Sequence, residues 1–545
     1  MSERPARSAT GRGSDRPADA APARGSQAGR PDTTAPVRLA NYIGGAWRLA
    51  DGVDTLDDVQ PATGEVAALV PLSGAAQVRE AVAAARTAQP AWREVPPQRR
   101  ARAVLRLREE LLRRREELTS LVTADMGKTL ADADGEVGRG IESVESAAAI
   151  PHLLKGETLE GVAAGVDVEL VRQPVGVVAA ITPFNFPAMI PLWFLPYAIA
   201  CGNSFILKPS EQDPRPASLI VAIVDSIEEI PPGVVNLVHG GREAVTAILD
   251  DPGIDAISFV GRAETARFVA ERAAATGKRV QALGGAKNAL VVMPDADLER
   301  AMPAIMGSAF GAAGQRCLAG SVCVAVGDEA RRDEVRAALV AAASALRVGA
   351  GDDPATDVCP MVSAAAREKL VEALGRAERD GAELLLDGRG ESGVANTLKD
   401  GGGTAGRRRT DGESNQTPVD GGPAGTLLGP TVAAVGDPES ELAREELFGP
   451  LLTVVDALDL DAALDFLNGS PYGNAGAIFT RSGKAARRYR YEAEAGMLGV
   501  NIGVPAPVAW FPFAGWKDSM AGDLHANGTD AVDFYTRKKV VTTRW

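Results

Sequence analysis

Four short apolar runs, each bounded by glycine or proline, constrain the fold of this chain more than any other feature of its sequence. They are VGVVAAITP (175–183), SFILKP (204–209), AISFVG (256–261) and ALVVMP (289–294). Each run is short and continuously apolar, as is typical of strands that are buried on both faces. Segments with helical spacing separate them, and this alternation predicts an α/β protein with a mostly parallel sheet.

The length and charge of the chain narrow the classes of protein further. At 545 residues it is too long for one hydrophobic core, so we expect two or more domains. Its formal net charge of −14 argues against nucleic-acid binding as the main function. The apolar stretch 188–200 is shorter than the ~20 residues that span a bilayer, and Pro191 and Pro196 interrupt it, so we expect no membrane insertion.

The cysteines and histidines are few and scattered. Cys201, Cys317, Cys323 and Cys359 form no CxxC pair, and the chain has only three histidines. The small number and the spacing of these cysteines and histidines do not suit a metal site, a Cys–His hydrolase or a disulfide framework. It predicts a reducing compartment, with the cytoplasm as the expected location.

Two segments have compositions too poor in apolar residues to fold alone. Residues 1–37 are rich in Arg, Ala, Ser, Gly and Pro, and we interpret them as a disordered tail. An organelle transit peptide is the alternative, although four acidic residues in this segment count against it. Residues 388–425 indicate a surface insertion within a domain, and their arginines 407–409 would suit a phosphate-binding patch or a solvated loop.

Polar or glycine-rich sequences follow three of the predicted strands: TPFNFP, KPSEQ and GRAET. In open parallel sheets, ligands bind beyond the carboxyl ends of the strands. No GxGxxG motif follows any of these strands, so the usual dinucleotide fingerprint is missing and a nucleotide site needs other support.

The segment FGAAGQRCLAGS (310–321) surrounds Cys317 with small residues and has Arg316 directly before it. Only a thiolate is an effective nucleophile, and a free thiol has a pKa near ~8.5, so a neighbouring cation and oriented backbone amides would favour attack. When this segment is considered alone, a small buried cysteine is the alternative.

Five motifs resemble, in order and spacing, those of the aldehyde dehydrogenase superfamily. They are TPFNFP (182–187), LKPSEQDP (207–214), SFVG (258–261), GAAGQRC (311–317) and EELFGP (445–450). The resemblance extends over about residues 38–545 apart from the insertion. It implies a chain of three parts: an NAD-binding domain with a Rossmann-like parallel sheet (38–155 and 175–285), an α/β catalytic domain (286–520) and a β oligomerisation arm (156–174 and 521–545).

A closer resemblance lies in GEVGRGIESVESAA (135–148), GAKN (285–288) and the ending PFAGWKDSMAGDLHANGTDAVDFYTRKKVV (512–541). These segments are similar to the CoA-acylating methylmalonate-semialdehyde dehydrogenases, which also act on malonate semialdehyde, in valine and inositol breakdown. The resemblance implies NAD as cofactor, coenzyme A as co-substrate and a homotetramer.

The resemblance also implies the catalytic and cofactor-binding residues. Cys317 would be the nucleophile, and Asn185 would donate to the oxyanion together with the Cys317 N–H; loss of one such donor typically costs ~2.7–4 kcal/mol. A carboxylate at Glu211, beside Lys208, would contact the adenosine ribose and repel an extra phosphate, which favours NAD over NADP. Considered alone, Asn185 would also suit a turn, and Lys208 and Glu211 a charged strand end. The cofactor-binding set comprises Thr182, Phe184, Lys208, Glu211, Gln212, Arg262, Gly284, Glu446 and Phe448.

Two positions depart from the family pattern. Arg262 stands where relatives usually carry serine near the pyrophosphate; its guanidinium would contact the pyrophosphate, or point to solvent and leave the helix weakly capped. Hydrolytic relatives have a glutamate four residues before the lysine of their glycine-rich segment, where this chain has Leu283. Water is a poor nucleophile without a base, whereas a CoA thiol attacks a thioester unaided, so we expect the acyl group to leave Cys317 to CoA.

The substrate that the resemblance implies is a semialdehyde with a carboxylate at its far end. Arg139 and Arg316 are the candidate partners of that carboxylate, and Arg139 would alternatively pair with Glu136 or Glu142 on its own helix. The expected reaction converts methylmalonate or malonate semialdehyde to propanoyl-CoA or acetyl-CoA with loss of CO2. The alternatives are an aldehyde dehydrogenase for another aldehyde, hydrolytic or CoA-acylating, and a non-catalytic scaffold of the same fold.

Overall fold

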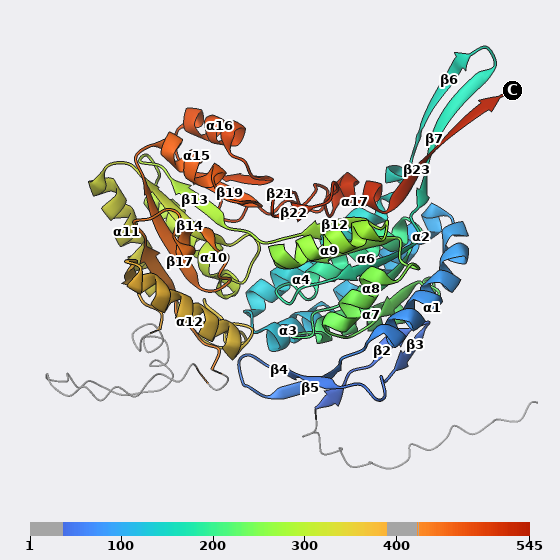
Figure 1. The fold of residues 1–545 in the computed structure, drawn as a ribbon, viewed down its shortest axis with the longest axis horizontal. Coiled ribbons are helices and arrows are strands. Elements are labelled where there is room, and N and C mark those ends of the chain that lie inside the picture. The colour runs from blue at the N-terminus through green and yellow to red at the C-terminus, as the bar shows by residue number, and fades with distance from the viewer. Residues whose placement is uncertain (1–35, 390–421, 423–424) are drawn as a thin grey trace, which may run out of the picture. The chain divides into compact units, whose positions relative to one another are not determined.

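A computed structural model describes residues 36–389, 422 and 425–545 of the chain (Figure 1). The predicted tail, 1–37, lies outside the described residues except for its last two, of which Val37 begins strand β1 (Val37–Arg38). Most of the predicted insertion, 388–425, also lies outside them. Residues Val37–Trp545 form one compact unit, and its main elements are two large sheets covered by helices.

The first large sheet has eight strands in the order β22-β12-β11-β8-β9-β10-β2-β3. Its five central strands are parallel, and three of the four predicted apolar runs supply β8, β9 and β11. The antiparallel strands lie at the two edges. The bounds are β2 (Asn41–Ile43), β3 (Ala46–Arg48), β8 (Val177–Ile181), β9 (Ser204–Lys208), β10 (Val235–Leu237), β11 (Ala256–Val260), β12 (Arg279–Leu283) and β22 (Met520–Ala521).

Helices cover both faces of this sheet, because alternate residues of a strand point to opposite faces. Val178 and Ala180 of β8 pack into one apolar cluster with α2 to α7, whereas Val177, Ala179 and Ile181 pack into another with α1, α8 and α9. This two-sided burial accounts for the continuously apolar runs in the sequence. The helices are α1 (Ala75–Glu94), α2 (Pro97–Arg113), α3 (Arg115–Met126), α4 (Leu130–Ala148), α5 (Ile150–Leu153), α6 (Met189–Ala200), α7 (Arg215–Asp225), α8 (Arg242–Asp250) and α9 (Ala263–Ala275).

The second large sheet has seven strands in the order β15-β16-β17-β14-β13-β19-β20, and all pairs except β15–β16 are parallel. The strands are β13 (Asn288–Val292), β14 (Gly320–Val326), β15 (Glu383–Leu386), β16 (Thr431–Ala434), β17 (Leu451–Ala457), β19 (Ala475–Phe479) and β20 (Met497–Val500). One face packs against α10 (Leu298–Phe310), α11 (Glu329–Ser344) and α12 (Ala364–Arg379), and the other against α15 (Leu460–Asn468) and α16 (Gly483–Glu492). The fourth predicted run supplies β13, near the centre of this sheet.

A third sheet joins the two chain segments that the sequence assigned to an arm. β7 (Val166–Pro174) pairs antiparallel with both β6 (Glu157–Ala163) and β23 (Thr536–Arg544), and every residue of β6 is exposed (Figure 1). The short helix α17 (Gly528–Phe534) leads into β23. The small remaining elements are β4 (Thr55–Val59), β5 (Val66–Pro71), α14 (Glu441–Arg444), β18 (Tyr472–Gly473) and β21 (Trp516–Lys517).

These observations confirm the predicted α/β class, the Rossmann-like parallel sheet and the β arm as a structural element. The division at 38–155 with 175–285, 286–520, and 156–174 with 521–545 stays a prediction, as does the role of the arm in oligomerisation. Within the described ranges, no helix combines the length and the apolar character that a membrane crossing requires.

Candidate active site

A cavity of about 250 Å³ lies between helix α4, the start of α6, the segment before β14 and residues 504–513. It brings together Arg139, Arg316 and Cys317, three predicted site residues that are far apart in the sequence. The acidic and basic side chains that also line it are Lys128, Asp132, Glu136 and Glu142. Apolar side chains complete the wall: Phe186, Met189, Trp193, Val504 and Phe513. A thiol, two guanidinium groups and an apolar surface therefore share one cavity.

Cys317 lies at the end of a tightly turned segment between α10 and β14. Two alanines in the preceding 3₁₀ helix η1 (Gly311–Gly314) have positive φ angles of 50° and 54°. Non-glycine residues in this left-handed region cost roughly 1–3 kcal/mol each and persist where the surroundings hold them. The side-chain amides of Asn288 and Asn474 donate to the Cys317 carbonyl oxygen at 2.9 and 2.8 Å. The backbone of the candidate nucleophile is therefore held by the first side chain of β13 and by the side chain just before β19.

The Cys317 residue retains some exposure, but its sulfur is closely surrounded, and burial raises the pKa of the thiol to about 12. The charge of Glu446 raises the pKa further, whereas the N–H groups of Cys317 and Leu318 and the Arg316 guanidinium lower it. The sequence predicted that a cation and backbone amides would favour the thiolate. Both act in that direction, but desolvation outweighs them, so the thiol is neutral at pH 7 and must lose its proton during attack.

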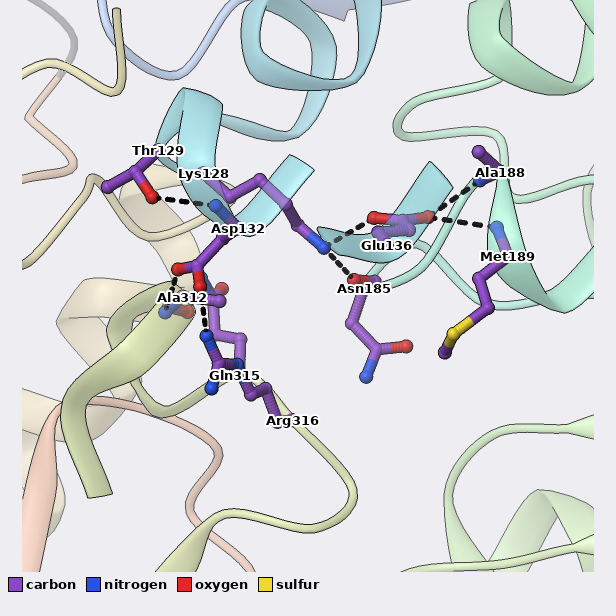
Figure 2. Close-up of polar contacts among 10 residues, drawn as sticks. All are labelled: Lys128, Thr129, Asp132, Glu136, Asn185, Ala188, Met189, Ala312, Gln315 and Arg316. Atoms are coloured by element: carbon purple, nitrogen blue, oxygen red, sulfur yellow. Dashed lines mark hydrogen bonds and ion pairs between the residues drawn. The ribbon is translucent and has the colours of Figure 1, made fainter. Parts of the chain in front are cut away.

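Asn185 lies in the loop between strand β8 and helix α6 and is buried. Its backbone carbonyl oxygen accepts a hydrogen bond from Lys128 Nζ at 2.8 Å, and its carboxamide points away from that contact (Figure 2). Lys128 Nζ also lies 2.6 Å from Glu136 Oε2, and these two side chains are 1% and 0% exposed. A buried ion pair is costly to desolvate and needs further hydrogen bonds, which the loop around Asn185 supplies.

Sequence reasoning missed Lys128, Asp132 and most of the role of Glu136. Glu136 entered only as a possible partner of Arg139 on the same helix, whereas its carboxylate pairs with Lys128. The available signal was the spacing of Asp132 and Glu136, which puts both on one face of a helix. That spacing is common on solvated helices, so only the fold reveals what the two carboxylates contact.

Both predicted carboxylate-binding arginines have acidic partners in the cavity wall. Arg316 Nη2 lies 2.5 Å from Asp132 Oδ1. Arg139 Nη1 lies 3.0 Å from Glu142 Oε2, one of the two helix pairings that the sequence left open, and Arg139 Nη2 donates to the Pro507 carbonyl oxygen. A guanidinium carries more N–H donors than these contacts use, so both arginines retain donors for a substrate carboxylate.

The predicted contacts to the adenosine ribose lie where β8 and β9 end side by side. The Thr182 N–H donates to the Lys208 carbonyl oxygen at 3.0 Å, which continues the parallel pairing of the strands. Lys208 is buried, and its Nζ lies 2.7 Å from Glu211 Oε2, so it is not an ordinary surface charge. The Thr182 hydroxyl is buried and has no hydrogen-bond partner among the described residues, whereas Gln212 is exposed. An orphaned hydroxyl beside a partly exposed carboxylate suits a ligand with sugar hydroxyls, as NAD has.

Glu446 and its surroundings form the other predicted part of the cofactor site. Glu446 Oε1 accepts a hydrogen bond from the Ala286 N–H at 3.0 Å. Burial raises the pKa of Glu446 to about 7, and the Ala286 N–H, Lys287 and Arg262 act against that rise. Arg262 itself is exposed and makes no capping hydrogen bond at the start of α9, so its guanidinium is free to contact a pyrophosphate or to point to solvent.

Three further predicted cofactor residues make close contacts. A Cβ atom on Gly284 would lie 2.7 Å from the Asp518 carbonyl oxygen, so only glycine fits there. The Phe184 and Phe448 rings pack edge to face, which joins the loop after β8 to the loop before β17. Most of the predicted cofactor residues thus surround the carboxyl ends of the first sheet, where the chemistry of a parallel sheet expects a ligand.

Parallel sheets, a thiol in a cavity and a buried asparagine in a nearby loop are the features expected of an aldehyde-oxidising enzyme, and comparison with known proteins gives the same class. The sequence pattern described as "Aldehyde dehydrogenase family" matches residues 47–402 and 394–541. The chain belongs to the aldehyde dehydrogenase family.

Within that family, the chain is similar to malonate-semialdehyde dehydrogenases. It is 46% identical over 516 residues to malonate-semialdehyde dehydrogenase 1 of Geobacillus kaustophilus (strain HTA426), a match that covers 95% of this chain and 99% of the relative. It is 45% identical over 497 residues to the malonate-semialdehyde dehydrogenase of Pseudomonas aeruginosa (strain PAO1), which covers 91% of this chain and 94% of the relative.

Solved structures give the same grouping. A methylmalonate-semialdehyde dehydrogenase from Oceanimonas doudoroffii superposes with a TM-score of 0.86 at 41% identity, covering 93% of this chain and 98% of that one. A Sinorhizobium meliloti 1021 protein in complex with NAD, provisionally named a methylmalonate-semialdehyde dehydrogenase, gives a TM-score of 0.87 at 39% identity, covering 94% of this chain and 99% of that one.

Proposed function

We propose that this chain oxidises malonate or methylmalonate semialdehyde with NAD and transfers the acyl group to coenzyme A, which yields acetyl-CoA or propanoyl-CoA and CO2. The observation that carries the proposal is the single cavity that contains the Cys317 thiol and the guanidinium groups of Arg139 and Arg316. The names of the relatives support the same substrate class. As the resemblance implies, such an enzyme would serve valine and inositol degradation.

The first half of the reaction uses Cys317 and Asn185. Cys317 Sγ attacks the aldehyde carbon and the thiol proton passes to solvent water as the C–S bond forms, which produces a hemithioacetal oxyanion. The Asn185 carboxamide and the Cys317 N–H donate to this oxygen, whose charge is absent in the aldehyde. NAD, when bound, supplies the acceptor for the hydride that leaves the same carbon. The residues that would hold it are Thr182, Phe184, Lys208, Glu211, Gln212, Arg262, Gly284, Glu446 and Phe448.

Decarboxylation follows from the chemistry of the bound thioester. A malonyl-type thioester has a carboxylate beta to its carbonyl group, and loss of CO2 leaves an enolate whose charge rests on the thioester oxygen. Asn185 can donate to that oxygen as it does to the earlier oxyanion. The enolate then takes up a proton, and the acyl group is an acetyl or propanoyl group on Cys317.

Release of the acyl group to coenzyme A is supported by Leu283. Its side chain is buried at the end of β12 and cannot accept a proton, although hydrolytic relatives carry a glutamate there. A thiol is ionised enough at neutral pH to attack a thioester without a base. The thioester on Cys317 would therefore last until coenzyme A arrives.

A hydrolytic aldehyde dehydrogenase is the second candidate, and one observation favours it. The charge of Glu446 acts on the Cys317 thiol, and burial raises the pKa of Glu446 to about 7. A carboxylate with that pKa is a suitable general base at neutral pH. Its hydrogen bond to the Ala286 N–H and its assignment to the nicotinamide ribose count against this role.

We further propose a homotetramer in which the sheet of strands β6, β7 and β23 contacts neighbouring subunits. The exposed apolar side chains Leu159, Val162 and Val540 on these strands support such a contact. The cysteines at 201, 317, 323 and 359 are all free thiols, which suits a reducing compartment such as the cytoplasm.

Product analysis with malonate semialdehyde tests the proposed function. The full chain is incubated with the semialdehyde and NAD, with and without coenzyme A, and NADH, CO2 and acetyl-CoA are quantified. We expect equal amounts of all three products with coenzyme A and, without it, a single turnover at most. Sustained NADH formation without coenzyme A would favour the hydrolytic candidate. An absence of NADH with any aldehyde, together with equal labelling of wild-type and Cys317→Ala protein by an electrophile, would favour a scaffold.

A further inference from the structure

Cys317 lines the cavity, and Asn185 directly precedes Phe186, which also lines it; the two residues lie on chain segments that belong to different sheets. Asn185 follows β8 of the first large sheet, and Cys317 precedes β14 of the second. An oxyanion donor acts only when it lies about 2.7–3.1 Å from the developing charge, and a misplacement of about 1 Å can cost a hundredfold in rate. An element that contacts both segments would therefore decide how well the oxyanion meets its donor.

Helix α4 contacts the Asn185 segment through Glu136, together with Lys128 from the residues just before the helix (Figure 2). Glu136 Oε1 accepts hydrogen bonds from the N–H groups of Ala188 and Met189, at 2.8 and 3.0 Å, where helix α6 begins. Glu136 Oε2 contacts Lys128 Nζ, which donates in turn to the Asn185 carbonyl oxygen. The loop is thus held at Asn185 itself and at the residues that follow it.

The same helix contacts the Cys317 segment through Asp132 (Figure 2). Asp132 Oδ2 accepts a hydrogen bond from the N–H of Ala312, one of the two alanines with positive φ, at 3.0 Å. Asp132 Oδ1 contacts Arg316 Nη2, and Arg316 Nη1 donates to the Gly307 carbonyl oxygen in α10 at 3.2 Å. Asp132 therefore holds the turn before the nucleophile and also the residue next to it.

Asp132 and Glu136 are four residues apart in α4, so their side chains lie on the same face about 6 Å apart along the helix axis. The Thr129 hydroxyl caps the helix by accepting from the Asp132 N–H at 3.1 Å, and Lys128 directly precedes this cap. One rigid helix end thus presents two carboxylates, at a fixed spacing, to the two segments that carry the reacting groups.

We propose that Asp132 and Glu136 are positioning residues for the oxidation. Asp132 sets the position of Cys317, Glu136 with Lys128 sets that of Asn185, and helix α4 fixes the distance between them. Neither carboxylate needs to touch the reacting atoms. The inference rests on the proposed roles of Cys317 and Asn185. It gives these two carboxylates of the cavity wall a role that is separate from substrate binding.

Turnover of propanal with NAD and coenzyme A tests this inference, because propanal has no carboxylate and does not require Arg139 or Arg316. For Asp132→Ala we expect kcat to fall about a hundredfold while KM changes less than threefold. Asp132→Asn keeps an oxygen acceptor for the Ala312 N–H, so its kcat should fall only about three- to tenfold. The matched control is Asp134→Ala, on the same helix as Asp132, which removes an exposed pairing with Arg115 of α3 and should keep kcat within twofold.

Alkylation of Cys317 by iodoacetamide separates the two carboxylates. Asp132→Ala releases the Arg316 guanidinium from its partner, so the thiol should react at least threefold faster although turnover is slower. Glu136→Gln should lower kcat at least tenfold and leave the alkylation rate unchanged, because it acts on the Asn185 segment. A general loss of structure would also expose the thiol, whose pKa is raised by burial, and would speed alkylation while turnover falls. The melting temperature of each variant is therefore measured, and the interpretation requires that it stays within a few degrees of the wild-type value.

Three results would overturn the inference. These are equal kcat values for Asp132→Ala and Asp134→Ala, an unchanged kcat for Glu136→Gln, or alkylation of Glu136→Gln altered as much as its kcat. If Asp132→Ala does not fold, Asp132→Asn decides: a lower kcat at an unchanged melting temperature supports positioning, and an unchanged kcat refutes it. A wild-type chain that is inactive on both propanal and malonate semialdehyde would instead refute the proposed function. The alkylation rates would then still test whether Asp132 positions Cys317.

Discussion

The rings of Phe184 and Phe448 meet edge to face, with their centroids 5.8 Å apart. Phe184 follows β8 of the first large sheet and Phe448 precedes β17 of the second, so this contact connects the two sheets. Phe448 has a φ angle of 55°, which is rare for an aromatic residue and is often found at functional sites. A small cavity of about 20 Å³ runs from Phe448 and Glu446 to Arg316, so the predicted nicotinamide residues lie close to the neighbour of the nucleophile.

Replacement of Glu211 by glutamine should relax the preference for NAD over NADP. The substitution keeps the size of the side chain but removes the charge that repels a ribose phosphate. We expect the KM for NADP to fall several-fold and the KM for NAD to rise three- to tenfold, since a charge-assisted hydrogen bond becomes a neutral one. Steady-state kinetics with both cofactors measure this. An unchanged ratio of the two kcat/KM values would remove Glu211 from the cofactor site.

Replacement of Glu446 by glutamine should make Cys317 more reactive. The charge of Glu446 contributes to the raised pKa of the thiol, so its removal lowers that pKa and increases the thiolate fraction at a given pH. We expect Cys317 to be alkylated several-fold faster at about pH 8, with the difference vanishing well below pH 7, where Glu446 is itself protonated. Peptide mass spectrometry after iodoacetamide treatment measures the rate.

The control for that experiment is Glu445→Gln, which changes an exposed carboxylate next in the sequence. It does not contribute to the raised pKa of the thiol and should leave the alkylation rate unchanged. Slower alkylation of Glu446→Gln than of the wild type would mean that Glu446 accepts the thiol proton, and it would strengthen the hydrolytic candidate.

Much of the fold could be predicted, because the strong signals in the sequence are local. The runs 175–183 and 204–209 contain β8 and β9 almost at their observed bounds, because a short apolar segment bounded by glycine or proline is typical of a buried strand. The residues at their carboxyl ends, such as Lys208, follow from the same argument, because parallel strands deliver their ends to one edge of the sheet.

The electrostatics of the site could not be predicted, because they depend on segments that are distant in the sequence. Helical spacing allows Arg139 to pair with either Glu136 or Glu142. Arg139 pairs with Glu142, because Glu136 packs against the start of α6 and pairs with Lys128. The neighbours of Cys317 indicated a lowered pKa, whereas burial by other segments raises it. Asp132 was not predicted as a site residue, because its partners Ala312 and Arg316 are distant in the sequence and come near it only in the folded chain.

Under the proposed function, replacement of Leu283 by glutamate should introduce hydrolytic activity. The substitution restores a carboxylate where hydrolytic relatives carry one, so that water can be activated to attack the thioester. We expect sustained NADH and free acid formation without coenzyme A, at about a hundredth or more of the wild-type rate with coenzyme A. The melting temperature should fall, because Leu283 is buried in an apolar cluster.

The matched control is Leu283→Gln, which has the same shape but no base. Chromatography of the acid product, alongside NADH absorbance, distinguishes hydrolysis from slow leakage of the thioester. If the glutamine and glutamate variants hydrolyse at the same rate, then the missing carboxylate is not what directs the acyl group to coenzyme A.

Replacement of Asp213 by asparagine should stabilise the protein at neutral and higher pH. Asp213 is fully buried, and neither of its carboxylate oxygens has a hydrogen-bond partner among the described residues. Burial raises the pKa of Asp213 well above its usual 3.8, and the charge of Asp125 adds to this rise while Lys128 opposes it. A carboxyl group with a raised pKa binds its proton more tightly in the folded state than in the unfolded chain. Its contribution to stability is therefore full below pH 3.8 and is lost as the pH rises through the folded-state pKa.

Asparagine has nearly the same size and does not ionise, so the variant should escape that loss. We expect the melting temperatures of Asp213→Asn and wild type to be similar near about pH 4 and to separate in favour of the variant up to about pH 8. Scanning calorimetry at several pH values measures the difference, and Asp51→Asn, at an exposed position, is the control that should show no such trend. A difference that does not grow with pH would show that the Asp213 carboxylate is already ionised and compensated in the folded protein.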